Sequence, residues 1–549
     1  MMAATVFAAL SSSAAQAADY YVDVNGDNAG LGTIADPWRT LSKVSGTSFL
    51  PGDRIFLQGG QTFNGRLAFG IDDAATAANP ITVSSYGTGR ATISSGLNEG
   101  IYVRDLGGFE ISNLNLVGAG RGSSMKNGVF FLYNPSGPSS RLDHVYIDNV
   151  EVSGYRNGIS IAGYVGLFSG KAGYNDVRIT NSVARDNASS GIIIWSFQGV
   201  AGYGHSNVYI GNTRAHDNYF ATRTPKEDEN GILVSNVDGA TIETSLTYNN
   251  GALGDGGVGT WTYESNNVVM QFCESYNNRT GGAHDGGGFD LDGGVTNSVM
   301  QYNYSHDNDG PGYLLAQYRG ARPFHNNIVR YNVSENDGRK HGSGAIDFWS
   351  DKLNGTNNVR DTVVHNNTIY VSPAPSGTAR AVRVIEGTGT TNVRVLNNVF
   401  VTTSGVPLVF SEATNNPTFQ GNNYWSSRGA FAITWGNTTY TSLSAWRSAT
   451  GQEMNGTTVT GTDVDPILTS PGNGGTIGNP ANLVNLTAYQ LQSTSPLIDS
   501  GLNLTAAPWS LNVGSSDYFN NALPQGSGYD VGAHEFVAAP TPPTPDVTN

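Results

Sequence analysis

Three segments in the middle of the chain repeat one alternating pattern: residues 268–278 (VVMQFCESYNN), 298–308 (SVMQYNYSHDN) and 327–337 (NIVRYNVSEND). Alignment of Val269, Val299 and Ile328 places these copies 30 and 29 residues apart. Weaker copies occur at 177–187, 208–218, 363–371 and 393–401. A fixed period of this length is typical of a repeat architecture in which each unit packs on the next.

A second short strand lies between successive copies and usually follows a glycine. Its segments are GISIAG, GIIIWS, GILVSN, GVGTWT, GFDLDG, GYLLAQ, GAIDFW and AVRVIE. Two or three short strands per repeat, with Asn- and Gly-rich turns, predict a parallel β-solenoid whose coils stack about 4.8 Å apart. Turn asparagines can bond to their neighbours above and below in a ladder. The pattern fits neither a leucine-rich repeat nor a propeller.

Composition excludes several classes of function. The 549 residues include 71 glycines, and 38% of them are hydrophobic, which favours a folded chain with many short strands over disorder. The net charge of −15 disfavours nucleic acid and anionic membranes as partners, because both require a basic surface. The single cysteine, Cys273, cannot form an internal disulfide, and we expect it to be a small buried residue.

The two ends of the chain differ from the repeats. Residues 1–18 combine a short apolar run with a small-x-small site at 15–17, so we predict an export signal and a secreted, periplasmic or cell-surface protein, although no basic residue precedes the run. No other stretch is apolar enough for a membrane helix, so no membrane insertion is expected. We assign residues 19–423 to the solenoid, with a capping helix that presents Trp38, Leu41 and Val44. Residues 424–537 form irregular C-terminal coils and a cap, and 538–549 a Pro/Thr-rich tail.

An acidic strand stands out at residues 284–294, HDGGGFDLDGG. Because strand side chains alternate, Phe289 and Leu291 should point inward, and Asp290 and Asp292 outward, about 7 Å apart. One coil earlier we place Trp261 at the position of Asp292. In other coils we place at that position Ser235, Ala316 and Phe348.

Charged residues also precede several of these strands. Asp228, Glu229, Asp255, Asp285 and Asp309, and then Lys340 and His341, fall two to four residues before the strand or its glycine. Stacked coils would align the acids in a column, in which like charges raise one another's pKa. The same column could hold Ca²⁺, with the candidate metal ligands Asp228, Asp255 and Asp309. No cofactor is otherwise required.

Three functions remain open for this acidic edge. Hydrolysis of a glycosidic bond needs two carboxyl groups, and Asp285 with Asp292 or Asp290 could supply them. A polysaccharide lyase would need a cation and a strong base, for which the candidates are Arg319, Arg322, Arg339, Lys340 and His341. The acidity of the chain would repel a polyuronate unless bound Ca²⁺ reversed the local charge, so hydrolysis is favoured. A non-catalytic glycan-binding protein or adhesin is the third possibility.

Further residues are candidates for contact with a carbohydrate. They are Trp261, His284, Gln317, Arg339, His341, Trp349 and Asp351. Trp261 could stack on a sugar ring or cover a hydrophobic flank. Alternation points Asp347 inward, which is costly for a charge. His284, His306 and His341 match no compact zinc motif.

Several segments resemble a known superfamily. Residues 20–44, 51–63 and 79–93 resemble the opening of secreted right-handed parallel β-helix proteins of the pectate-lyase-like superfamily, and 495–503 and 528–536 resemble their closing segments. The resemblance implies an all-β, right-handed parallel β-helix, and we expect a monomer that acts on a carbohydrate. The spacing of Asp285 and Asp292 in DGGGFDLD is similar to the catalytic segment of lacto-N-biosidase-type β-helix glycoside hydrolases. This similarity implies that Asp285 is the acid/base and Asp292 the nucleophile.

Overall fold

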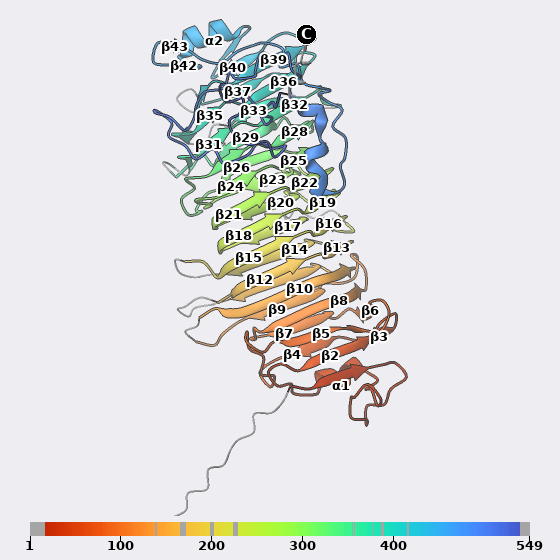
Figure 1. The fold of residues 1–549 in the computed structure, drawn as a ribbon. Coiled ribbons are helices and arrows are strands. Elements are labelled where there is room, and N and C mark those ends of the chain that lie inside the picture. The colour runs from red at the N-terminus through yellow and green to blue at the C-terminus, as the bar shows by residue number, and fades with distance from the viewer. Residues whose placement is uncertain are drawn as a thin grey trace, which may run out of the picture.

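The protein is a parallel β-solenoid of about 12 turns, as the sequence predicts. The structure, a computed structural model, describes residues 17–137, 140–164, 172–197, 202–222, 229–353, 355, 357–375, 377–385, 389–413 and 417–538. The strands stack along one axis from the N-terminal to the C-terminal end (Figure 1). The predicted export signal and tail fall almost wholly outside the described residues. No helix in the described ranges is long and apolar enough to span a membrane.

The strands of successive coils form three parallel ladders. The first ladder contains β1 (Asp19–Val22), β2 (Arg54–Gln58), β5 (Ile81–Tyr86), β8 (Phe109–Gly118), β10 (Leu142–Ser153), β12 (Tyr174–Thr180), β15 (His205–Gly211), β18 (Val237–Glu243), β21 (Asn266–Gln271), β24 (Val299–Gln301), β27 (Ile328–Arg330), β31 (Val363–His365), β35 (Arg394–Leu396) and β38 (Thr418–Gln420). The second ladder shares β8 and β10 and adds β3 (Thr62–Asn64), β6 (Ala91–Gly96), β13 (Val183–Arg185), β16 (Arg214–His216), β19 (Leu246–Tyr248), β22 (Glu274–Tyr276), β25 (Tyr304–His306), β28 (Val333–Glu335), β32 (Thr368–Val371), β36 (Val399–Thr403) and β39 (Asn423–Ser427).

The third ladder is a separate sheet that carries the candidate site. It contains β4 (Leu67–Phe69), β7 (Ile101–Arg104), β9 (Val129–Tyr133), β11 (Ile159–Tyr164), β14 (Ile192–Phe197), β17 (Ile232–Ser235), β20 (Thr260–Tyr263), β23 (Phe289–Leu291), β26 (Tyr313–Gln317), β29 (Gly344–Ser350), β33 (Arg380–Val384), β37 (Val409–Ser411) and β40 (Ile433–Trp435). The antiparallel strand β41 (Thr438–Tyr440) closes it. Short pairs are formed by β30 (Val359–Arg360) with β34 (Thr390–Thr391), and by β42 (Met454–Asn455) with β43 (Thr458–Val459).

Residues that the sequence repeat aligns are paired in neighbouring strands of the structure. Val269 pairs with Val299, and Val299 pairs with Ile328. Two chains of side-chain hydrogen bonds run through the turns. In each chain, every asparagine amide donates to the side-chain oxygen of the next member, and the last acceptor is a carboxylate. The first chain contains Asn187, Asn218, Asn250, Asn278, Asn308 and Asp337, and the second contains Asn303, Asn332, Asn367, Asn398, Asn422 and Glu453. Cys273 is buried, and burial raises the pKa of its thiol to about 12.

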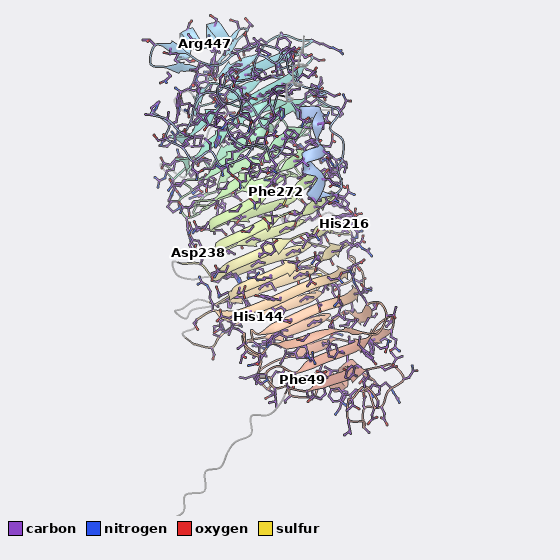
Figure 2. All side chains as sticks on the ribbon, in the orientation of Figure 1. Phe49, His144, His216, Asp238, Phe272 and Arg447 are labelled. Carbon is purple, nitrogen blue, oxygen red and sulfur yellow. The ribbon has the colours of Figure 1, made fainter. Side chains whose placement is uncertain are left out.

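Helices cover both ends of the core. The predicted N-terminal helix is α1 (Leu41–Ser45), capped by the Thr40 side chain, and it buries Leu41 and Val44. At the other end α2 (Leu443–Thr450) packs Trp446 against aromatic rings of the last coils. Phe49 and Arg447 mark these two ends among the side chains (Figure 2). Both caps shield the open end of a stack of coils from solvent.

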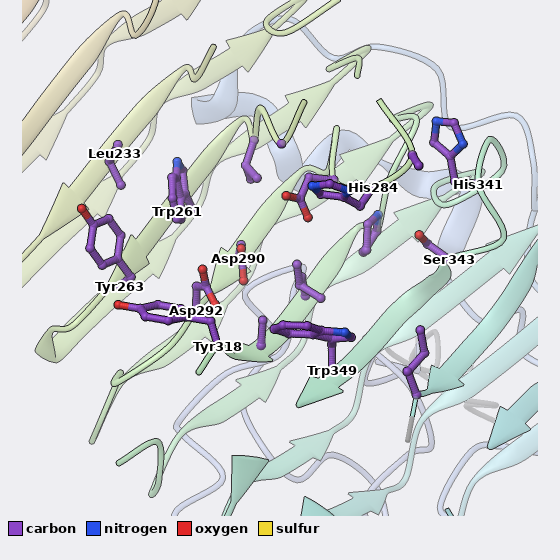
Figure 3. A pocket seen from close by; sticks show the side chains of 18 of the residues that line it. Leu233, Trp261, Tyr263, His284, Asp290, Asp292, Tyr318, His341, Ser343 and Trp349 are labelled. Carbon is purple, nitrogen blue, oxygen red and sulfur yellow. The ribbon is translucent and has the colours of Figure 1, made fainter. Parts of the chain in front are cut away.

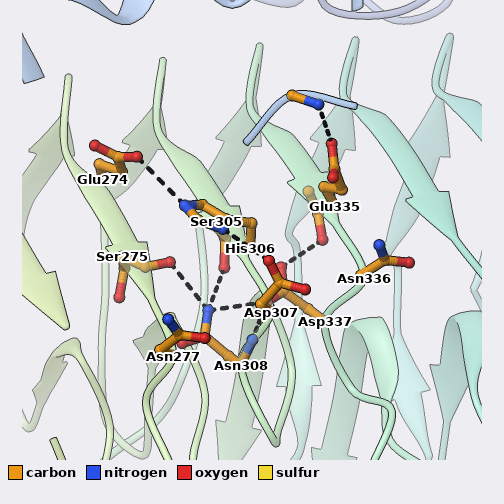
Figure 4. A network of polar contacts seen from close by, with 12 residues as sticks. Glu274, Ser275, Asn277, Ser305, His306, Asp307, Asn308, Glu335, Asn336 and Asp337 are labelled. Atoms are coloured by element: carbon orange, nitrogen blue, oxygen red, sulfur yellow. Dashed lines mark hydrogen bonds and ion pairs between the residues drawn. The ribbon is translucent and has the colours of Figure 1, made fainter. Parts of the chain in front are cut away.

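After α2 the chain returns along the outer side of the second ladder. The 3-10 helices η1 (Pro480–Asn485) and η2 (Thr487–Tyr489) belong to this segment. The Gly474 backbone N–H donates to Glu335, and those of Ile477 and Gly478 donate to Glu274. His306 lies between Glu274 and Asp307 (Figure 4). Burial opposes its charge, but hydrogen bonds to both acids prevail and raise the pKa of His306 to about 9.

Candidate active site

A cleft of about 1030 Å³ lies on the outer face of the third ladder. Its floor consists of outward side chains from β14 to β33, and its rim comes from the loops before β20, β23, β26 and β29. Asp290 and Asp292 lie at its centre, between Trp261 and Trp349 (Figure 3). The predicted residues Asp285, His284 and His341 also line the cleft.

The register of the floor corrects two sequence predictions. Trp261 pairs with Asp290, and not with Asp292. The segment GVGTWT holds two glycines, and the strand begins after the second, Gly259, so alignment on the first misplaces Trp261 by two residues. Phe348 likewise does not take the position of Asp292, because it pairs with Leu315, and both are buried in the core.

The prediction for Asp347 is corrected as well. It pairs with Leu314, which pairs with Asp290, so Asp347 lies in the outward row, whereas the sequence predicted an inward side chain. The strand β29 has one more residue after Gly344 than the neighbouring segment has after its glycine, and a shift of one residue exchanges the two faces. Asp347 is 0% exposed and forms an ion pair with Arg383 at 2.6 Å. Sequence reasoning missed Arg383, which lines the cleft.

Asp290 is the most buried acid of the cleft, with 3% of its surface exposed. Burial raises the pKa of Asp290 well above its ordinary value, and the charges of Asp292, Asp285 and Asp347 raise it further. Burial and the three neighbouring carboxylates thus favour the protonated form of Asp290 over that of a free carboxyl group.

Asp285 and Asp292 flank Asp290 along the chain. Asp285 is partly exposed, on the loop before β23, and its backbone is left-handed with φ of 54°. Asp292 directly follows β23 and is half-buried, and the Gly293 backbone N–H donates to its Oδ1 at 2.6 Å. A side chain at Gly293 would lie 2.4 Å from the Tyr318 ring, so close packing between coils requires the glycine there.

Aromatic rings surround the acids. Trp261 is 8% exposed and contacts Tyr263, with ring centroids 5.3 Å apart, and Tyr263 meets Tyr318 edge to face. Trp349 lies on the other side of the acids (Figure 3). Aromatic faces beside polar groups suit a sugar ring, which has an apolar face and hydroxyl edges. Sequence reasoning missed Trp195, Tyr263 and Tyr318. Alternation within GIIIWS could have revealed Trp195, whereas Tyr318 follows β26 in a loop.

Three of the predicted contact residues lie elsewhere. Gln317 is buried, where it accepts from the Gly294 N–H and donates to the Arg322 carbonyl. Arg339 binds Asp307 and Ser372 and does not line the cleft. Asp351 lines a smaller adjoining hollow of about 420 Å³, which it shares with Trp349.

The predicted acid column is only partly present. Asp228 lies outside the described residues. The carboxylate of Glu229 is buried and accepts backbone N–H groups, including that of Gly254. Asp309 forms ion pairs with Arg279 and Lys340, at 2.9 and 2.8 Å. Within the described ranges, no group of three or more His, Cys, Asp or Glu side chains is placed so that it could hold a metal ion. Asp255 therefore belongs to no such group.

The cations proposed for a lyase are also mostly engaged. Arg322 pairs with Glu264, and Lys340 with Asp309. Arg319 is exposed and does not line the cleft. Of the five candidates only His341 lines it, and burial lowers the pKa of its imidazole, with Lys340 acting in the same direction.

Comparison with known proteins gives one curated relative and a group of solved structures. No protein-family model matches the chain. The sequence is 24% identical over 449 residues to the lacto-N-biosidase of Bifidobacterium longum subsp. longum, which covers 64% of this chain. The chain spans only 27% of that relative's length. The GH136 lacto-N-biosidase from Eubacterium ramulus superposes with a TM-score of 0.51 and 17% identity, over 68% of this chain and 66% of that one. The chain is thus a parallel β-helix protein that is similar in sequence and in fold to lacto-N-biosidases.

Proposed function

We propose that the protein is a glycoside hydrolase that cleaves its substrate in the cleft on the third ladder. The observation that carries the proposal is the gathering of Asp285, Asp290 and Asp292 in one aromatic-lined cleft. Glycosidic bond cleavage needs one carboxylic acid to protonate the leaving oxygen, and one carboxylate on the other side of the bond. A strongly coupled set of acids provides both protonation states at one pH.

Within this set we assign Asp285 as the acid/base and Asp292 as the nucleophile. Asp285 comes from the rim and Asp292 from the end of β23, so the two can approach a bound sugar from different elements. The Gly293 N–H fixes one oxygen of Asp292, which orients the group for attack. A nucleophilic Asp292 predicts retention of the anomeric configuration.

The first substrate to test is the disaccharide for which the relatives are named, lacto-N-biose, linked to a leaving group. The cleft contains an acidic centre and an apolar wall formed by Ile193, Leu233 and Trp261, which suits an uncharged sugar better than a polyuronate. A lyase is disfavoured because Arg322, Lys340 and Arg383 already neutralise protein carboxylates.

The proposal extends to the location, the oligomeric state and the cofactors of the protein. The apolar run at the N-terminus supports work outside the cytoplasm. We propose a monomer that requires no cofactor. The predicted calcium site lacks support at Asp309, whose oxygens bind Arg279 and Lys340.

The test is a screen of the purified protein against a glycan panel and the p-nitrophenyl glycoside of lacto-N-biose, with and without EDTA. We expect new reducing ends, no ultraviolet absorbance from unsaturated uronates, and no effect of EDTA. Asp285→Asn and Asp292→Asn should each lower kcat by about 100-fold or more. Asp72→Asn, an exposed acid in the loop after β4, is the matched control and should have wild-type rates. Full activity of both cleft variants would refute the proposal.

A further inference from the structure

Polar atoms without protein partners face the cleft. Oδ1 of Asp290, Nε1 of Trp261 and Nε2 of His341 are each buried, and none has a hydrogen-bond partner among the described residues. All three residues line the cleft. Buried polar atoms in folded proteins are nearly always bonded, so a group of orphans in one cleft indicates an external partner.

Asp290 is the most informative of these residues. Its neighbours across the ladder are Trp261 and Leu314, and a leucine side chain can neither donate nor accept a hydrogen bond. Three nearby strands hold apolar side chains at the equivalent position, namely Ile193, Leu233 and Leu314. The solenoid therefore does not require an acid at this position for its packing.

The charges that face Asp290 determine what it can do. Asp285, Asp292 and Asp347 are close enough to act on it, and the only cation among the groups in that row, Arg383, is bound to Asp347. The imidazoles of His284 and His341 lie on the rim. A buried acid among three others is more stable with its proton than without it. A neutral carboxyl group donates one hydrogen bond, and Oδ1 of Asp290 has no acceptor among the described residues, so a ligand in the cleft can supply it.

We propose that Asp290 is a substrate-binding residue that donates a hydrogen bond, as a neutral acid, to an oxygen atom of the sugar in the cleft. The inference rests on the proposed hydrolase and deepens it. Asp285 and Asp292 carry out the bond cleavage, and Asp290 selects and positions the sugar from the floor. The orphan Nε1 of Trp261, on the adjacent strand, offers a second donor to the same ligand.

Two substitutions at Asp290 separate this role from catalysis. Asp290→Asn keeps the size and an N–H donor, whereas Asp290→Leu keeps the size and removes it. The probes are the p-nitrophenyl glycoside of lacto-N-biose, or whichever p-nitrophenyl glycoside the wild type cleaves, and the free sugar, whose binding is measured by calorimetry. Circular dichroism verifies that each variant is folded. Infrared difference spectra of wild type against Asp290→Asn report the neutral carboxyl band directly.

The expected results differ between the variants. Asp290→Asn should retain kcat/KM within about tenfold, because the amide still donates. Asp290→Leu should lose about 10- to 100-fold in kcat/KM and in affinity for the free sugar, mainly through KM, because the sugar oxygen loses its donor. Asp292→Asn should lower kcat and leave the affinity for the free sugar nearly unchanged. The neutral carboxyl band should disappear from Asp290→Asn.

Other results would overturn the inference. If Asp290→Asn is as inactive as Asp292→Asn, the reaction needs an ionised Asp290, and the donor role is wrong. If Asp290→Leu binds the sugar as tightly as the wild type, Asp290 does not contact it. If the wild type binds the sugar but does not cleave any glycoside of the panel, the hydrolase proposal fails, and the affinities of the two variants still decide the role of Asp290. If it binds no sugar, both proposals fail.

Discussion

Asp337 is the last member of the first chain of side-chain hydrogen bonds, the one that begins at Asn187. It gives a prediction of how stability changes with pH, with a defined sign. The side chain is fully buried. Asn308 donates its backbone N–H and its side-chain amide to Oδ1, and Ser334 donates to Oδ2. Burial raises the pKa of Asp337 from 3.8 to about 6, although these hydrogen bonds lower it. The five earlier members of this hydrogen-bonded chain are all asparagines.

We expect Asp337→Asn to stabilise the protein at neutral pH. The pKa of Asp337 is higher in the folded state than in the unfolded state, so its contribution to stability is lost as the pH rises from about 4 to about 6. The shift from 3.8 to about 6 is roughly 2 units, each worth about 1.4 kcal/mol, so the ionised acid costs about 3 kcal/mol above that range. Asparagine removes the charge and still accepts from Asn308.

Urea unfolding, followed by tryptophan fluorescence, measures the effect. At about pH 7.5 the variant should exceed the wild type by up to about 3 kcal/mol, and at about pH 4 the difference should nearly vanish. Asn278→Asp is the reciprocal control. It places an acid inside the same chain of side-chain hydrogen bonds and should destabilise the protein more at the higher pH. Equal stabilities of Asp337→Asn and the wild type at pH 7.5, or a gain that persists at pH 4, would refute the reasoning.

Three further predictions concern the cleft and the C-terminal segment. Arg383→Met leaves Asp347 buried without its partner and should lower the unfolding free energy by about 3–5 kcal/mol, and addition of Asp347→Asn should restore most of it in the same urea assay. Trp261→Ala should raise KM for the p-nitrophenyl glycoside about tenfold, which corresponds to about 1.4 kcal/mol of lost contact, and an unchanged KM would exclude stacking on the sugar. Protonated His306 stabilises the fold fully below pH 6.5, its pKa in the unfolded state, and this stabilisation is lost as the pH rises through its folded-state pKa of about 9. Limited proteolysis should therefore release the C-terminal segment faster at alkaline pH. In His306→Phe the cleavage rate should not show this step.

The fold was predictable because each coil repeats the same local contacts. The interval that aligns Val269, Val299 and Ile328 in the sequence is the interval between paired strands, and the turn asparagines mark the same period. The C-terminal return was not predictable in this way. Its bonds join residues that are far apart in the chain, as Gly474 and Glu335 are, at 139 positions from each other, and no local pattern encodes such a contact.

The sequence predicted the acids of the candidate site and several residues around them. It did not predict which of them pair between neighbouring strands. The acids of β23 were found because Asp285, Asp290 and Asp292 lie close together in the glycine-rich segment HDGGGFDLDGG. The glycine before each strand was a poor marker of register, since the turns differ in length. An error of two residues kept Trp261 on the correct face beside the wrong neighbour, and an error of one placed Asp347 on the wrong face. Tyr318 follows the strand in a loop, where alternation no longer applies.

The position of the acids in the solenoid explains how the protein tolerates them. In a stack of coils, each coil interacts mainly with its two neighbours, so a locally unfavourable group weakens only its own interfaces. The coil that carries Asp290 has continuous strand pairing on both sides, and the side-chain amide of Asn278 in this coil donates to Asn308 in the next. A cluster of buried acids that costs stability can therefore persist where its chemistry is useful. We infer that Asp290→Leu stabilises this coil while it weakens sugar binding, and hydrogen exchange of the β23 amides measures the first effect independently of the second.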